Sequence, residues 1–396
     1  MTMRKKILIL NGSHSEATLI LKAKELGYYV VTTGNNPSLM GHSFSDEYIC
    51  ADYSDKEAIL DLVQNNGIDS IVSCANDFGV ITASYVAGKM GWKGHDTYQN
   101  ANTIHKKDLF KNLLQRLAIR TPYSKAFDSK DEAIDYARCA QYPVIVKATD
   151  LTGGKGILRA DNMEQAVFAI DNAFARSRAK RILIEEFIIG VQQSIDTFVI
   201  NKKVVSSVSN DVFCPINPYL IQSEILPAKG IERIQDELHG FIEKMCQDLD
   251  LVDGMFTLQY IVRDGKPYII EGMRRALGNQ FLTVARAVNG FPWEEALIRA
   301  ETGMDLSGLQ SEPPMADIVG HHGIMATRNG IVRSYTIPPE IERHLFQKID
   351  IIAPGEAITD YMNQRIAYIY YTYENREEAV EAVSHFNDRI KIEFED

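Results

Sequence analysis

Apolar stretches of strand length alternate with amphipathic stretches of helix length at the start of the chain. Residues 7–10 and 28–33 are short and apolar, and residues 16–26 between them have helical periodicity. The same order recurs over residues 55–90. This alternation is typical of a parallel sheet with helices on both faces, whose ligands gather at the carboxyl ends of the strands. We therefore expect an α/β, Rossmann-like first domain over residues 1–105.

The pattern changes further along the chain. Apolar strands expected over residues 143–148 and 181–186 flank a glycine-rich loop. Residues 194–210 and 257–271 show the alternation of antiparallel hairpins, and Asp264-Gly265 provides the turn of the second one. This part of the chain is therefore expected to be α+β.

The length of 396 residues, with 45% hydrophobic content, allows two or three domains. After the first domain we expect a central domain over residues 106–310 and a small C-terminal α+β domain over residues 311–396. In the last of these, residues 366–373 are predicted to form a strand and residues 376–387 a helix.

The formal net charge of -11 offers no basic face for nucleic acid or for an anionic membrane, so any phosphate must be held locally. The five cysteines are widely spaced and form no CxxC pair, which argues against a disulfide framework or a zinc site. The apolar run at residues 7–12 is too short for a signal peptide, and no run approaches the roughly 20 apolar residues of a membrane span. We therefore expect a cytoplasmic protein.

The most informative segment runs from Pro143 to Ile157. An apolar strand delivers Lys147 and then breaks into a loop with three glycines and Lys155. Glycines let backbone N–H groups approach phosphate oxygens, and the lysines supply compensating charge, so the loop can close over a polyphosphate. It is neither a Walker A loop nor a dinucleotide-binding Gly-x-Gly-x-x-Gly. A plain glycine-rich turn between two strands is the alternative.

A second segment, residues 181–190, is an apolar strand that ends in Glu185 and Glu186 and continues with Phe187 and Ile188. A carboxylate at this point can read the amino group of adenine while the apolar side chains contact the ring. The alternative is a solvent-exposed strand end.

The third segment is the hairpin over residues 257–271, which carries Gln259 and Glu271 twelve positions apart. Their even separation, allowing for the turn, can place both side chains on one face of the sheet, where their oxygens could hold Mg²⁺. Arg275 follows shortly after and could pair with the transferring phosphoryl group. An edge hairpin with an incidental polar face is the alternative.

These segments, in this order, resemble those of ATP-grasp enzymes, in the branch that contains carbamoyl phosphate synthetase large subunits, glycinamide ribonucleotide synthetases and biotin carboxylase. Residues 103–110 resemble the helix at the domain boundary, and Lys107 matches a lysine that approaches the ATP phosphates. Glu271, Arg275 and Gly278 match the Glu-x-Asn-Pro-Arg-x-x-Gly signature.

The resemblance implies an ATP-grasp fold with a preATP-grasp domain and a lid subdomain over about residues 120–190. It implies an ADP-forming ligase that activates a carboxylate as an acyl phosphate and makes a C–N bond with an amine or a related nucleophile. Its partners would be small-molecule substrates, with no nucleic acid and no membrane, and a homodimer is left open. The resemblance further implies ATP, with Mg²⁺ or alternatively Mn²⁺, bound by a set of matching positions. The ATP-binding positions are Lys107, Lys147, Gly153, Gly154, Lys155, Gly156, Glu185, Glu186, Phe187 and Ile188, the metal ligands are Gln259 and Glu271, and the catalytic residues are Lys147 and Arg275.

Three positions depart from the family pattern. Met273 replaces the asparagine of the signature and removes one metal ligand, Arg274 replaces its proline, and Gln192 stands where many relatives have glutamate. These departures keep open a second reading, in which the chain is a catalytically decayed ATP-binding regulator or scaffold.

Several other polar residues follow strands in the sequence. Asn76-Asp77 comes after the strand expected at residues 70–73 and is a better candidate for contacting substrate than His14, although an Asx turn explains it equally well. His321 and His322 are adjacent on an expected strand and would point to opposite sides, so a structural role is expected for both.

Overall fold

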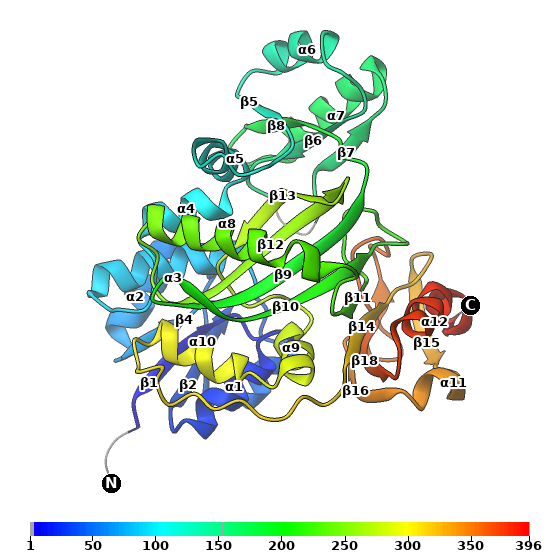
Figure 1. Ribbon diagram of the computed structural model, residues 1–396. Coiled ribbons are helices and arrows are strands. Elements are labelled where there is room, and N and C mark those ends of the chain that lie inside the picture. Colours follow the sequence, from blue (N-terminus) through cyan, green and yellow to red (C-terminus); the bar gives the residue numbers. More distant parts are fainter. Residues whose placement is uncertain (1–3, 152–153, 396) are drawn as a thin grey trace.

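The computed structural model describes residues 4–151 and 154–395 (Figure 1). Its first sheet has four parallel strands in the order β3-β2-β1-β4. These are β1 (Lys6–Leu10), β2 (Tyr29–Gly34), β3 (Glu47–Cys50) and β4 (Ser70–Val72). The helices of this part are α1 (Ala17–Glu25), α2 (Lys56–Asn65) and α3 (Asp77–Met90), with a 3-10 turn η1 (Met40–Phe44). The parallel pairing confirms the α/β architecture predicted from the alternation.

Helices cover both faces of this sheet because side chains alternate along β1. Ile7 and Ile9 share one apolar cluster with Leu19 of α1, whereas Leu8 and Leu10 share another with α2 and α3. Two short helices, α4 (Tyr98–His105) and α5 (Lys107–Arg116), then lead out of this part of the chain.

A second four-stranded sheet follows, drawn at the top of Figure 1. Its strands pair antiparallel in the order β5-β8-β6-β7. They are β5 (Ser124–Phe127), β6 (Val144–Ala148), β7 (Ile157–Ala160) and β8 (Ile182–Glu186). One face packs on α6 (Lys130–Arg138) and α7 (Met163–Arg176) through a cluster rich in alanine. We call this unit the lid sheet.

The central sheet has eight antiparallel strands in the order β13-β12-β9-β10-β11-β14-β18-β16. The first five are β9 (Val191–Ile200), β10 (Lys203–Phe213), β11 (Ser223–Leu226), β12 (Gly254–Arg263) and β13 (Lys266–Met273). Helices α5 and α8 (Gln235–Asp248) pack on one face, beside the 3-10 turn η2 (Ile231–Arg233). Helices α9 (Phe281–Asn289) and α10 (Trp293–Glu301) pack on the other face and join it to the first sheet.

The C-terminal residues continue this sheet through β14 (Ile318–Ile324), β18 (Ala367–Tyr373) and β16 (Leu345–Asp350). A three-stranded sheet of β17 (Ala357–Ile358), β15 (Gly330–Thr336) and β19 (Lys391–Phe394) and the helices α11 (Pro339–Glu342) and α12 (Arg376–Arg389) complete the fold. The strand and helix predicted for this segment correspond to β18 and α12. Since β14 pairs with β11, the C-terminal part shares one sheet with the central part, and the domain boundaries stay predictions.

The described part of the chain has no helix that is both long and apolar enough to cross a membrane. All five cysteines are free thiols.

Candidate active site

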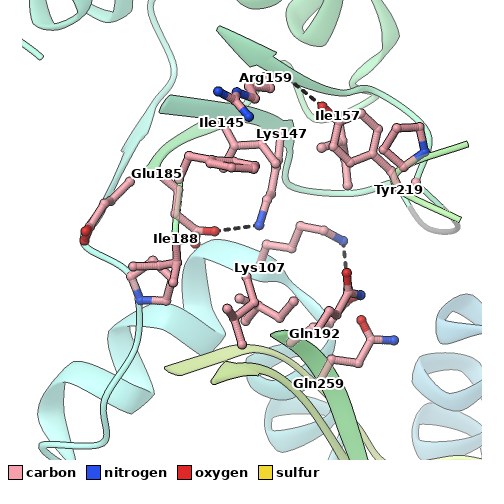
Figure 2. A pocket seen from close by; sticks show the side chains of 18 of the residues that line it. Lys107, Ile145, Lys147, Ile157, Arg159, Glu185, Ile188, Gln192, Tyr219 and Gln259 are labelled. Atoms are coloured by element: carbon pink, nitrogen blue, oxygen red, sulfur yellow. Dashed lines mark hydrogen bonds and ion pairs between the residues drawn. The ribbon is translucent and has the colours of Figure 1, made fainter. Parts of the chain in front are cut away.

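A cavity of about 410 Å³ lies between the lid sheet and the central sheet (Figure 2). Strands β6, β7 and β8 of the lid sheet provide one wall, and β9, β12 and β13 provide the other. Part of the lining is apolar and part is charged. The apolar side chains are Pro122, Ile145, Ile157, Phe187, Ile188, Pro218, Ile261 and Ile270. The charged ones are Lys107, Lys147, Arg159, Glu185, Glu186 and Glu271.

Lys147 and Glu185 meet because their strands are neighbours. In the β6–β8 register Ile145 lies opposite Glu185, so Lys147, two residues along, is a diagonal neighbour on the same face. The Lys147 Nζ donates to Glu185 Oε1 at 2.6 Å, and the Lys111 Nζ forms an ion pair with Oε2 at 2.7 Å. Figure 2 shows Lys147 and Glu185 pointing toward each other in the cavity.

Burial would raise the pKa of Glu185, but Lys111 and Lys147 more than offset it, and the net pKa lies below its usual value. Burial lowers the pKa of Lys111 to about 8, against the opposing effect of Glu185. The Glu185 carboxylate is therefore the shared counterion of two lysines. The expectation that this carboxylate also accepts from the amino group of adenine stays a prediction, because a carboxylate offers about four acceptor positions and two lysines do not fill them.

Lys107 and Glu271 form a second ion pair in the same cavity. The Lys107 Nζ donates to Glu271 Oε1 at 3.0 Å and to the Leu151 carbonyl at 2.8 Å. Burial lowers the pKa of Lys107, but Glu271 and Asp77 outweigh it and the net pKa is raised, so the ammonium keeps its charge.

Gln259 lies directly opposite Glu271 in the β12–β13 register, and both side chains line the cavity. The prediction that the two share one face of the hairpin is therefore confirmed.

A second cavity of about 350 Å³ adjoins the first, and the two share Gly154, Gln192, Tyr219, Gln259 and Glu271 as lining residues. We call the first the nucleotide cavity and the second the substrate cavity, because the resemblance to ATP-grasp enzymes implies ATP at the lysines of the first and a carboxylate beside it.

Arg275 lines the substrate cavity and is held there by Asp77. Its Nε donates to Asp77 Oδ1 at 2.6 Å, and its Nη2 lies 3.3 Å from the Met273 sulfur. Burial raises the pKa of Asp77, but Arg275 and His105 lower it more, and the net pKa lies well below its usual range. Asn76 caps α3 by accepting from the Phe78 N–H, so an Asx turn is present. Asn76 and Asp77 also line the substrate cavity.

The departures from the family signature have separate places in the structure. Arg274 is buried outside both cavities, where its Nε donates to Asp96 Oδ2 at 2.8 Å, so its role is structural. Met273 lies in the substrate cavity beside Arg275, and Gln192 lies in the wall between the two cavities.

Of the glycine-rich loop, Gly154 lines both cavities. Gly153 is outside the described residues. Gly154 has a φ of +74°, and a Cβ there would lie 2.4 Å from the Tyr219 carbonyl oxygen, so only glycine fits this close approach. Gly156 also has a positive φ, of +71°. Lys155 is exposed and lines neither cavity, so its role in binding ATP stays a prediction.

The expected structural histidines have separate partners. The His321 Nε2 lies 2.5 Å from Glu224 Oε2, and the His322 Nδ1 lies 2.6 Å from the Ser223 hydroxyl. The two rings therefore do not converge on one ion, as expected. His14 lines the substrate cavity and stacks on Tyr368.

Other residues at the site were missed from the sequence. Lys111 lies four positions after Lys107 on α5, so helical spacing could have signalled it. Tyr219 lines both cavities, and its hydroxyl accepts from the Arg159 N–H at 2.9 Å, which ties the loop after β10 to the lid sheet (Figure 2). The Arg159 guanidinium lies 4.4 Å from the centre of the Phe187 ring. No motif marks Tyr219 in the sequence.

Comparison with known proteins identifies relatives with an ATP-grasp domain. Residues 105–212 match the family model of the phosphoribosylglycinamide synthetase ATP-grasp (A) domain. The carbamoyl phosphate synthase large chain of Clostridium perfringens is 23% identical over 320 residues, which cover 76% of this chain and 29% of that one. The chain thus spans less than a third of the length of this curated relative.

Solved structures match nearly the whole chain. An L-amino acid ligase from Bacillus licheniformis has a TM-score of 0.81 at 16% identity and full coverage of both chains. The biotin carboxylase domain of the Hydrogenobacter thermophilus 2-oxoglutarate carboxylase, solved with MgADP and bicarbonate, has a TM-score of 0.76 at 20% identity and covers 99% of this chain and 91% of that one. Residues 105–212 therefore match an ATP-grasp domain family, and the chain as a whole has the fold of ATP-grasp enzymes.

Proposed function

We propose that the chain is an ADP-forming ligase that phosphorylates a carboxylate with Mg-ATP and passes the acyl group to an amine or a related nucleophile. One observation carries this proposal. A lysine-lined cavity and a second cavity that holds Arg275 meet at Gln259 and Glu271. A nucleotide in the first and a carboxylate in the second would therefore approach each other at this junction.

The nucleotide cavity has the size and polarity for ATP. Its volume of about 410 Å³ falls in the usual range for small-molecule sites. Adenine would lie against Phe187 and Ile188, where the lining is apolar, and the phosphates would lie between Lys107 and Lys147. Two ammonium groups on opposite walls would offset the charge of the polyphosphate.

The site also fits Mg²⁺. Glu271 and Gln259 offer a carboxylate and an amide oxygen side by side, and Mg²⁺ is commonly held by one or two carboxylates together with substrate phosphates. When bound, the ion supplies charge neutralisation at the transferring phosphoryl group.

The remaining residues orient the reactants. Asp77 holds the Arg275 guanidinium at 2.6 Å, so this cation is fixed in the substrate cavity before a carboxylate arrives. A carboxylate oxygen placed there would attack the γ-phosphorus, with ADP as the leaving group. The nucleophile would then displace phosphate from the acyl carbon. The tight contact between Gly154 and Tyr219 would limit hydrolysis of the acyl phosphate by keeping water out of the junction.

The names of the relatives support C–N bond formation, since they include phosphoribosylglycinamide synthetase and L-amino acid ligase. The activity of carbamoyl phosphate synthase is not carried over, because this chain spans only 29% of that protein. The homodimer, the cytoplasmic location and the domain boundaries stay predictions.

The test is ADP release from Mg-ATP against a panel of carboxylates and amino acids, alone and in pairs with amines. Hydroxylamine replaces the amine in a parallel series, because it traps acyl phosphates as hydroxamates. We expect carboxylate-dependent ADP release together with a hydroxamate. Binding of ATP without ADP release across the whole panel would instead support the decayed regulator.

A further inference from the structure

Two charged side chains of the substrate cavity, Glu224 and Arg365, each have a buried polar atom without a hydrogen-bond partner among the described residues. The other ionic groups of the cavity are paired, because Asp77 holds Arg275 and Lys107 holds Glu271. Glu224 and Arg365 also line the cavity, and neither pairs with an oppositely charged Asp, Glu, Lys or Arg side chain in the described part of the chain. A carboxylate oxygen and a guanidinium N–H that lack hydrogen-bond partners in one cavity indicate a ligand that carries both charges.

Glu224 is the acceptor for a cation. It lies on β11 and is only 1% exposed. Its Oε2 lies 2.5 Å from the His321 Nε2, and its Oε1 is buried with no hydrogen-bond partner among the described residues. A buried carboxylate oxygen without a donor is costly, so a ligand that donates to it and carries positive charge gains affinity.

Arg365 is the donor for an anion. Its Nη2 donates to the Ile221 carbonyl at 2.7 Å and its Nη1 to the Asn363 carbonyl at 3.3 Å, which fix the plane of the guanidinium. Its Nε is buried and has no partner among the described residues. Arginine has five N–H donors, so three remain for a carboxylate.

The His14 side chain, which also lines this cavity, does not change the charge balance. Burial, with a further contribution from Arg365, lowers the pKa of His14 to about 4. His14 is therefore neutral near pH 7 and adds no positive charge that would compete with a cationic ligand for Glu224.

We propose that the substrate cavity binds a zwitterionic amino acid, with its ammonium at Glu224 and its carboxylate at Arg365. This inference rests on the proposed function, because it names the class of one substrate of that ligase. A simple carboxylic acid would leave Glu224 without a partner, and a simple amine would leave Arg365 without one. The cavity volume of about 350 Å³ is sufficient for an amino acid. Arg365 precedes β18, so the C-terminal segment supplies half of the recognition.

Calorimetric titration of the whole chain with Mg²⁺ and a non-hydrolysable ATP analogue tests the inference. The standard amino acids are screened first, and each binder is compared with the matching acid that lacks the amino group and the matching amine that lacks the carboxylate. We expect both analogues to bind at least about tenfold more weakly, as for the loss of one charged hydrogen bond. Equal binding of an amino acid and its deaminated acid, or no binding by any amino acid, would overturn the inference.

Two variants assign the residues. Glu224→Gln should remove the preference over the deaminated acid, and Arg365→Gln should remove the preference over the decarboxylated amine. Glu232→Gln, at an exposed position on another part of the chain, is the matched control and should keep both preferences. Thermal unfolding checks that the variants fold, and the comparison of analogues on the wild type stands without them. Retention of both preferences in the two folded variants would contradict the assignment.

A failure of this inference is distinguishable from a failure of the proposed function. Selective amino acid binding without ADP release or hydroxamate would refute the proposed ligase function and support the proposed binding site. Hydroxamates formed equally from amino acids and from plain carboxylates would support the proposed ligase function and refute the proposed amino acid site. A hydroxamate of the bound amino acid would identify it as the acyl donor, and its absence beside a productive second carboxylate would identify it as the acceptor.

Discussion

Lys111 links the geometry of the nucleotide cavity to a measurable stability. Its ammonium is buried between Glu185 Oε2, the Thr121 hydroxyl and the Ile269 carbonyl. Burial lowers its pKa from an ordinary 10.5 to about 8, with Glu185 opposing. Between these two values the unfolded chain holds a proton that the folded chain has released, so the free energy of unfolding rises with pH.

The size of the effect follows from the shift. A difference of about 2.5 pH units at about 1.36 kcal/mol per unit gives about 3 kcal/mol. Replacement of the lysine in Lys111→Met removes this contribution. The free energy of unfolding of the wild type, minus that of Lys111→Met, should therefore increase by about 3 kcal/mol as the pH rises from about 8 to about 10.5.

Urea unfolding at a series of pH values, followed by tryptophan fluorescence, measures this difference, because Trp293 is fully buried in the core. Lys125→Met, at an exposed position on the lid sheet, is the control and should follow the wild-type pH profile. The reasoning would be refuted if Lys111→Met and the wild type had parallel pH profiles, since the ammonium would then not be desolvated by the fold.

The remaining predictions concern turnover. Glu271→Ala should lower kcat by about 10²- to 10³-fold, equivalent to about 2.7–4 kcal/mol, with an unchanged circular dichroism spectrum. A wild-type kcat in this variant would mean that the metal site lies elsewhere. Tyr219→Phe removes the hydrogen bond from the Arg159 N–H and should weaken ATP binding by about 2- to 10-fold, or about 0.5–1.5 kcal/mol, in a calorimetric titration. Unaltered ATP affinity would exclude a role of the Tyr219 hydroxyl in holding the lid sheet. Met273→Asn should keep kcat similar and lower the Mg²⁺ concentration needed for half-maximal ADP release, because the amide adds an oxygen ligand near Glu271. A large fall in kcat would contradict this prediction.

Local signals in the sequence were sufficient for most elements near the site. Period-two alternation with an Asp264-Gly265 turn predicts one hairpin, which is present. The turn alone pairs residues at odd separations, such as Tyr260 with Ile269, and a bulge between Gln259 and Tyr260 brings Gln259 opposite Glu271, which the spacing does not signal. Lys107 and Lys147 lie at a helix start and on a buried strand, and both reach the nucleotide cavity.

Long-range pairing was not accessible from the sequence. The two lysines around Glu185 come from α5 and β6, and only the register of β6 with β8 reveals that their charges share one carboxylate. The pairing of Glu224 with His321 depends in the same way on the contact between β11 and β14, which are about 90 residues apart. Lys155 was assigned by its place in a glycine-rich loop, and the direction of a side chain in such a loop follows from backbone conformation rather than from spacing.

A crystal structure with Mg²⁺ and a non-hydrolysable ATP analogue tests the central claim most directly. We predict that adenine lies against Phe187 and Ile188, the phosphates lie between Lys107 and Lys147, and the metal is ligated by Glu271 and Gln259. Density for the nucleotide at the carboxyl ends of β1 and β4, or phosphates directed away from Glu271, would contradict the account.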